Sequence, residues 1–196
     1  VGTTFVRQQK KSVYKNVTIS LEGDMIRNNI HVSLEDEYCH TDLFGLYSPE
    51  GTEHMDNHTT VDHKYPNSTS NELYKGIIGD KATGVFNGSI FVRPNAQNTN
   101  AFQSNKNILL TGEATVHAKP QLEIWADDVK CSHGCTSGQI DEESLFYLRA
   151  RGLSKNQARA LLLKAFTTDV TREIEVESLR EYVEKKLEKK LLKDVY

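Results

Sequence analysis

Short apolar bursts with alternating side chains recur at a nearly constant step along the first two thirds of the chain, and this step most constrains the fold. Val17, Val32, Leu46, Val61 and Ile77 are 15, 14, 15 and 16 residues apart. Alternation over four or five residues with many β-branched side chains is typical of strands. No helical pattern of useful length separates the bursts, so the region up to about residue 125 is predicted to consist of strands.

The corners between the bursts are polar and carry turn-forming residues. Turn signals lie at residues 22–24, 48–51, 65–68, 87–88 and 93–95. Evenly spaced short strands with such corners are compatible with a sandwich, a barrel or a β-solenoid. The steady step and the scarcity of two-residue hairpin turns favour the solenoid.

The hydrophobic period becomes helical after about Gln139. Asp141 can cap a short helix that ends at Gly152, and Ser154 with Gln157 forms a capping box. One helical stripe is predicted from Ala158, Leu161, Leu162, Ala165 and Phe166, and another from Leu179, Val183, Leu187 and Leu191. Residues 1–138 are thus predicted to form the strand body, and residues 139–196 a small helical domain that packs on the body, on a partner or on both.

Composition excludes several classes of protein. A net charge of −3 and a pI near 6.2 argue against a dedicated nucleic-acid binder. No apolar run approaches the roughly 20 residues that span a bilayer, so no membrane partner and a cytoplasmic location are expected. No nucleotide-binding phosphate loop or serine nucleophile motif is present in the sequence. The first residue is Val1, which leads us to expect a fragment of a longer chain.

The stretch 126–135, with the sequence ADDVKCSHGC, contains the chain's most unusual chemistry. Cys131, His133 and Cys135 offer two thiolates and an imidazole, which are ligands of zinc, copper and iron–sulfur centres. A closed four-ligand site needs a second pair, so this stretch can supply only part of a site. The structural alternative is a thiol at a strand end, a histidine in a turn and a small buried cysteine. Cys39 stands alone and is interpreted as a small buried residue.

A second polar cluster contains His54, Asp56, His58, Asp62 and His63. Strand geometry places His54 and His58 on one face and His63 on the other. Such a cluster could serve a β-helical carbohydrate-active lyase or hydrolase, although Lys64 is the only cation close by in the sequence. The alternative interpretation is a polar solenoid face.

Residues 122–166 resemble the C-terminal signature of the SufB/SufD family, and they are closer to the SufD type. The stretch reads LEIWADDVKCSHGCTSGQIDEESLFYLRARGLSKNQARALLLKAF. The resemblance implies a right-handed parallel β-helix followed by a C-terminal helical domain. It also implies a non-catalytic scaffold for iron–sulfur cluster assembly, which pairs with SufB and with the ABC-type ATPase SufC.

The same resemblance assigns roles to individual residues. His133 and Cys131 match positions that assist a transient cluster at the SufB–SufD junction, with no stably bound cofactor. Cys135 stands where relatives carry a small residue without a thiol, so it is either an extra ligand or a small core side chain. Candidate SufC-docking residues on the helices are Leu153, Leu162 and Phe166, with internal helix packing as the alternative for all three. Without SufB, a homodimer through the same surface is expected.

Overall fold

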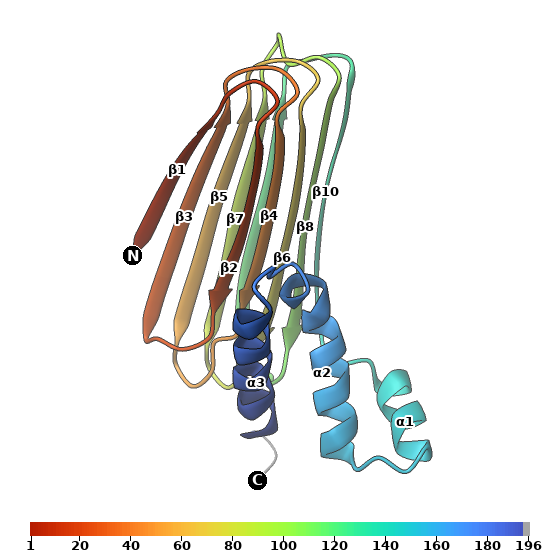
Figure 1. The fold of residues 1–196 in the computed structure, drawn as a ribbon. Coiled ribbons are helices and arrows are strands. Elements are labelled where there is room, and N and C mark those ends of the chain that lie inside the picture. Colours follow the sequence, from red (N-terminus) through yellow and green to blue (C-terminus); the bar gives the residue numbers. More distant parts are fainter. Residues whose placement is uncertain (194–196) are drawn as a thin grey trace.

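The computed structural model describes residues 1–193, which form ten strands and three helices. The strands are β1 (Gly2–Gln8), β2 (Val13–Ser20), β3 (Met25–Leu34), β4 (His40–Tyr47), β5 (His54–His63), β6 (Thr69–Ile78), β7 (Thr83–Val92), β8 (Thr99–Leu109), β9 (Thr115–Ile124) and β10 (Val129–Gly138). The helices are α1 (Glu142–Ala150), α2 (Lys155–Thr171) and α3 (Glu177–Lys193). Figure 1 shows long strands side by side in two layers, with the helices gathered at one end of the strands.

Successive strands alternate between two parallel sheets. The odd sheet has the order β1-β3-β5-β7-β9, and the even sheet has the order β10-β8-β6-β4-β2. Two consecutive strands therefore make one turn of a solenoid, and the step near 15 residues is half a turn. The predicted parallel β-solenoid followed by helices is confirmed, and the sandwich and barrel alternatives are wrong.

The register keeps side chains in rows across successive turns. Ile30 of β3 pairs with Thr59 of β5, which pairs with Gly88 of β7. Alternate residues of each strand point into the solenoid, so β7 is alternately buried and half-buried along its whole length. The interior is mostly aliphatic and aromatic, including Leu34 and Phe86, but it also contains buried polar side chains.

The turn predicted at Asn87-Gly88 is wrong, because both residues lie in the middle of β7. Gly88 faces the interior, where a Cβ atom would collide with the Gln103 amide of the opposite sheet and with the Phe86 ring. The glycine is therefore needed for a close approach between the two sheets and not for a turn.

The helices α2 and α3 cover part of the outer face of the even sheet. Leu46 of β4 packs with Val170 of α2, Ile174, and Val183 and Leu187 of α3 in one buried cluster. The Asp141 cap and the Ser154 capping box are present as predicted. No helix within residues 1–193 is long and apolar enough to cross a membrane.

The predicted apolar stripe of α2 is partly wrong. Ala158 is buried, but Leu161 and Ala165 are exposed, while Leu163 and Thr167 face the sheet instead. Residues 160–163 are all apolar, so their pattern does not single out one face, and the true inner face includes buried threonines. In α3 the residues Val183, Leu187 and Leu191 are buried as predicted, whereas Leu179 is exposed.

Candidate functional site at the open end of the solenoid

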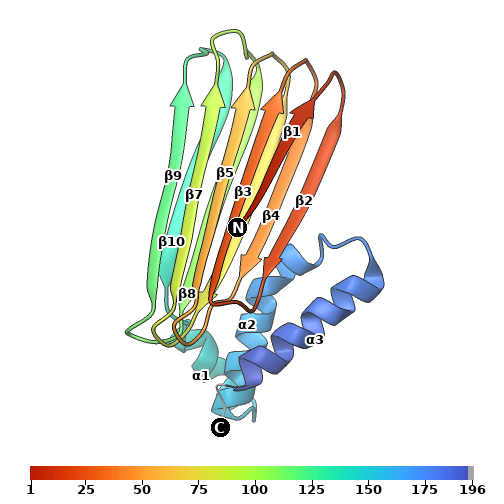
Figure 2. The ribbon, with the colours of Figure 1, turned by 90° about the vertical axis from the view of Figure 1, so that its left-hand side faces the viewer.

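Cys131, His133 and Cys135 lie on β10, the last strand of the even sheet. They alternate along the strand, so all three share the face that points toward the solenoid interior. Their neighbours in β8 are Ala101, Gln103 and Asn105, which are all buried. No further described strand follows β10, and Figure 2 shows β9 and β10 at the opposite side of the solenoid from β1 and β2. Interior-facing side chains are therefore accessible at this open end.

The two thiols of β10 differ in burial, but both lose part of their contact with solvent to the protein. Cys131 is half-buried and packs against the main core, and Cys135 is exposed with its Sγ 3.7 Å from Asn105 Oδ1. Burial raises the pKa of the Cys131 thiol and, likewise, the pKa of the Cys135 thiol. Both groups are therefore neutral thiols near pH 7, and a bound metal ion would have to displace their protons.

Strand spacing limits how these side chains can act together. At about 3.3 Å per residue, Cys131 and Cys135 are about 13 Å apart along β10, whereas each is about 7 Å from His133. One metal ion can thus be reached by His133 and one thiol, but not by all three side chains. Within residues 1–193 no group of three or more histidine, cysteine, aspartate or glutamate side chains could hold a metal ion. The strand offers part of a ligand set, and the metal roles of Cys131, His133 and Cys135 stay predictions.

The histidine and aspartate cluster of β5 is divided between the two faces of the strand, as the spacing predicted. His63 points inward, where its Nε2 lies 2.9 Å from Ser70 Oγ and burial lowers its pKa to about 4. On the outer face, Arg27 Nη1 donates to Asp56 Oδ2 at 3.0 Å, and His58 Nε2 lies 2.8 Å from Asp56 Oδ1. Asp56 is thus held by cationic and imidazole groups.

Lys64 is the only cation close to this cluster in the sequence, but two arginines are close to it in space. Arg93 donates to both oxygens of Asp62, at 2.8 and 3.2 Å, while Lys64 pairs with Glu35 of the preceding turn. These arginines were missed because they are one solenoid turn away, about 30 residues along the chain from the carboxylates they bind. The two aspartates therefore take part in ion pairs between turns.

The three predicted docking residues are all half-buried. Phe166 contacts a buried cluster of Ile77, Leu163 and Leu191, and the Lys75 ammonium lies 4.6 Å from its ring centroid. Leu162 lines a groove between α1 and α2 and a second groove beside the end of β10. Phe166 thus serves to attach α2 to the sheet, and the docking roles of Leu153, Leu162 and Phe166 stay predictions.

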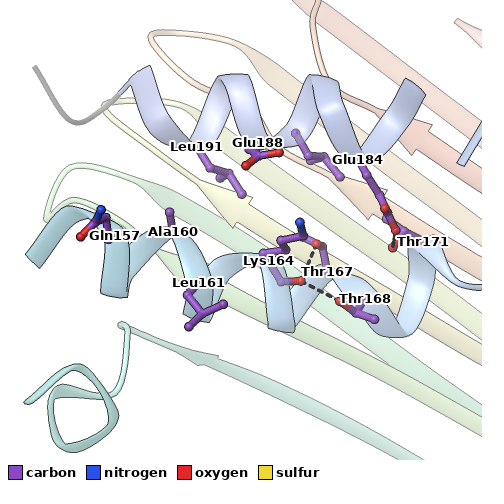
Figure 3. Close-up of a pocket in the computed structure, with 11 residues that line it drawn as sticks. Gln157, Ala160, Leu161, Lys164, Thr167, Thr168, Thr171, Glu184, Glu188 and Leu191 are labelled. Carbon is purple, nitrogen blue, oxygen red and sulfur yellow. Dashed lines mark hydrogen bonds between the residues drawn. The ribbon is translucent and has the colours of Figure 1, made fainter. Parts of the chain in front are cut away.

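Three apolar side chains on the helices are more exposed than these candidates, and they were not predicted from the sequence to serve in docking. Phe146 and Tyr147 of α1 are 73% and 58% exposed, and Leu161 of α2 is 47% exposed. Leu161 also lines a cavity of about 440 Å³ between α2 and α3, and Leu187 and Leu191 of α3 line it as well. Figure 3 shows the side of α2 and α3 that encloses this cavity, with Leu161 and Leu191 labelled. Two adjacent aromatic residues on a short helix are a usable signal, because both cannot face the same inner side.

Comparison with known proteins assigns the chain to a family. The family model for the SUF system FeS cluster assembly, SufBD core domain, matches residues 1–166. The chain belongs to the SufBD family. The matched SufBD core comprises the solenoid, α1 and α2 as far as Phe166, and α3 lies beyond the matched stretch.

Several curated relatives carry SufBD family names. An iron–sulfur cluster assembly SufBD family protein of Synechocystis is 37% identical over 92% of this chain and 40% of its own length. The iron–sulfur cluster assembly protein SufD of Escherichia coli is 39% identical over 83% of this chain and 38% of its own length. The chloroplastic protein ABCI7 of Arabidopsis thaliana is 38% identical over 85% of this chain and 35% of its own length. The chain therefore spans about two fifths of the length of these three relatives.

Proposed function

We propose that the chain is a non-catalytic scaffold segment for iron–sulfur cluster assembly, which pairs with a SufB-type partner at its open end and binds a SufC-type ATPase through its helices. The observation that carries the proposal is the position of Cys131 and His133. They lie on an edge strand, face the open interior and make an incomplete ligand set. Membership of the SufBD family supplies the iron–sulfur context.

The edge of β10 is suited to pairing with another chain. Proteins commonly protect exposed edge strands with charges, prolines or bulges. In β10 the only charged side chain is Lys130, and the residues from Cys131 to Gly138 are uncharged and mostly small. A partner strand added here would bring its own ligands next to Cys131 and His133, which would complete a site shared between two chains.

Iron and sulfide are cargo at this site, and no cofactor is resident. His133 and Cys131 would hold the nascent cluster transiently, and Cys135 would act as an extra ligand or as a small side chain at the end of the core. Because both thiols have raised pKa values, cluster loading would release protons. The loss of those protons makes loading more favourable as pH rises.

The exposed apolar surface of the helices suits an ATPase partner. Phe146 and Tyr147 of α1 line a groove together with Leu162, and Leu161 of α2 lines the separate cavity between α2 and α3. Interfaces are typically built around such aromatic and aliphatic anchors. Leu153 remains a candidate in the connection just before α2. In this proposal, ATP-driven motion of the partner moves α2 and, through its attachment to β6, the strands that lead to the open end.

The remaining parts of the proposal concern the setting of the chain. Without SufB, two copies would pair through the same edge as a symmetric dimer. We also propose a cytoplasmic location, although one relative is named as chloroplastic. The carbohydrate-active alternative gains no support, because Asp56 and Asp62 are engaged in ion pairs with arginines.

Cluster formation in a reconstituted complex tests the proposed site. The chain is combined with SufB-type and SufC-type partners, ATP, iron(II) and a sulfide donor, and the visible absorption of iron–sulfur clusters is followed. His133→Ala should abolish most of the absorption, while His31→Ala, on the outer face of the odd sheet, should leave it unchanged. Equal cluster yields from both variants would refute the assigned role of His133.

A further inference from the structure

His133 is the last member of a row of interior side chains that crosses three strands. By register, His133 of β10 lies beside Gln103 of β8, and Gln103 lies beside Glu72 of β6. Adjacent strands are about 4.8 Å apart, so neighbouring side chains in such a row are within hydrogen-bonding reach. Beyond Glu72 the row continues with Leu43, which makes Glu72 the inner end of the polar part.

Glu72 and Gln103 form a buried pair. Their residues are 4% and 3% exposed, and Gln103 Nε2 donates to Glu72 Oε2 at 2.5 Å. A carboxylate only accepts hydrogen bonds, so this contact orients the amide with its nitrogen toward Glu72. Burial raises the pKa of the Glu72 carboxyl to about 7, so above that pH an anion lies two strands behind His133.

The other end of the Gln103 amide lacks a partner. Gln103 Oε1 is buried and accepts no hydrogen bond from the described residues. Asn105 is the next residue of β8 that faces the interior, and its amide already donates to the Tyr47 hydroxyl and the Tyr74 carbonyl. Across the interior, Gln103 meets Gly88, which has no side chain. A buried acceptor without a partner is costly, and the polar side chain on its remaining flank is His133.

We propose that Glu72 and Gln103 are positioning residues for His133: Glu72 holds the Gln103 amide, and Gln103 Oε1 accepts a hydrogen bond from the His133 ring. The inference rests on the proposed function, because a fixed imidazole tautomer is useful only if His133 binds the cargo at the open end. Neither residue touches the cargo; both act through His133.

The consequence is control of the imidazole tautomer. A neutral imidazole carries its proton on either ring nitrogen, and the hydrogen bond made by one nitrogen determines which of them offers a lone pair. Ligand histidines typically donate their second ring N–H to a fixed acceptor. Gln103 would thus keep the proton on the inward nitrogen and leave the outward lone pair available at the junction.

Nitrogen-15 NMR of histidine-labelled protein measures this tautomer directly. Spectra are recorded on the intact chain at about pH 8, where imidazoles with an ordinary pKa of about 6.5 are neutral. The His133 resonance is assigned by its loss in His133→Asn, and exposed His117 on β9 is the internal reference. We expect His133 to favour one tautomer at least about fivefold more than His117 does, which is the preference that one neutral hydrogen bond confers.

Four variants distinguish a specific effect on the His133 ring from a general loss of stability of the chain. Gln103→Met keeps the side-chain length but removes the acceptor, so His133 should take the tautomer ratio of His117. Glu72→Met should do the same by releasing the amide, whereas Glu72→Gln retains an acceptor for Gln103 Nε2 and should keep the preference. Gln121→Leu, on the outer face of β9, should change nothing at His133.

Two results would overturn the inference. One is a His133 tautomer ratio in the unchanged chain that matches His117, and this result decides alone if Gln103→Met does not fold. The other is an undiminished preference in a folded Gln103→Met chain. The measurement needs no partner, so it is independent of cluster assembly: full cluster yield from His133→Ala would refute the proposed function while leaving the tautomer result standing.

Discussion

Lys75 Nζ of β6 lies 2.6 Å from Asp169 Oδ2 of α2, and the same ammonium donates to the Phe166 carbonyl oxygen at 2.7 Å. The Lys75 side chain is only 4% exposed, although it starts on the outer face of a strand. A buried ammonium is tolerated when it is paired and hydrogen-bonded. These contacts fasten α2 to the solenoid, so a force applied to the helices is passed to β6.

Replacing Asp169 with alanine should weaken this attachment. The change leaves the buried Lys75 with one fewer acceptor, and we expect the free energy of unfolding to fall by about 2 kcal/mol, the range for hydrogen bonds to charged groups. Lys75 lowers the pKa of Asp169, so the contribution is present above the ordinary aspartate pKa of about 3.9 and is lost as pH falls through the lower folded value. Urea unfolding measures the effect, with exposed Asp127→Ala as control; equal stabilities would contradict it.

Gly88→Ala should destabilise the chain by crowding the interior. The added Cβ would meet the Gln103 amide and the Phe86 ring, and overpacking of this kind typically costs about 1–3 kcal/mol. Gly112→Ala is the matched control, because a Cβ at Gly112 has no atom within 4 Å. Thermal unfolding of both variants should show a lower midpoint for Gly88→Ala alone. A Gly88→Ala chain as stable as the control would mean that the two sheets do not meet here.

The buried Glu72 carboxyl should make stability depend on pH in a defined direction. Its folded pKa is raised to about 7 from an ordinary value of 4.5, so the folded chain retains this proton after the unfolded chain has released it. The free energy of unfolding should therefore decrease from about pH 4.5 to about pH 7, by at most about 3 kcal/mol, and then level off.

Denaturant titrations at several pH values compare the unchanged chain with Glu72→Gln. The isosteric amide does not titrate, so the variant should lose this part of the pH dependence. Exposed Glu123→Gln should keep it. Parallel pH profiles for the unchanged chain and Glu72→Gln would show that Glu72 titrates normally.

The three cysteines should react with alkylating reagents in the order of their exposure. Cys135 is exposed, Cys131 is half-buried, and Cys39 is buried with its Sγ 3.2 Å from the Gln9 and Asp36 carbonyl oxygens. The raised pKa values of Cys131 and Cys135 should make both slower than a free cysteine at neutral pH. Mass spectrometry after timed alkylation gives the order, and rapid labelling of Cys39 in the folded chain would contradict the structure.

Local sequence patterns predicted much of the fold. The period-two bursts identified strands, and the step from Val17 to Val32 is the distance from one sheet to the other. The caps at Asp141 and Ser154 were readable because their partners lie within three residues. The strand pattern was followed only to about residue 125, so the position of Cys131, His133 and Cys135 on one face of β10 was not predicted, and a turn at His133 is wrong because it lies in the middle of that strand.

Contacts between turns could not be predicted in the same way. Arg27 and Asp56, or Glu72 and Gln103, are about 30 residues apart, and their meeting depends on the register of stacked turns. Gly88 resembled a turn residue because the side chain that needs its space comes from another strand. The buried face of α2 was ambiguous for a similar reason: only packing on the even sheet distinguishes Leu163 from Leu161.

The measurement that tests the central proposal most directly is calorimetric titration of the chain with its SufC-type ATPase, with and without ATP. We expect binding with a dissociation constant of about 1 μM or tighter, which corresponds to about −8 kcal/mol. Phe146→Asp and Leu161→Asp should each weaken it at least about tenfold, because a charge replaces an apolar anchor, whereas Phe5→Asp on β1 should not. Absence of binding by a chain whose helices are folded by circular dichroism would contradict the proposed scaffold function.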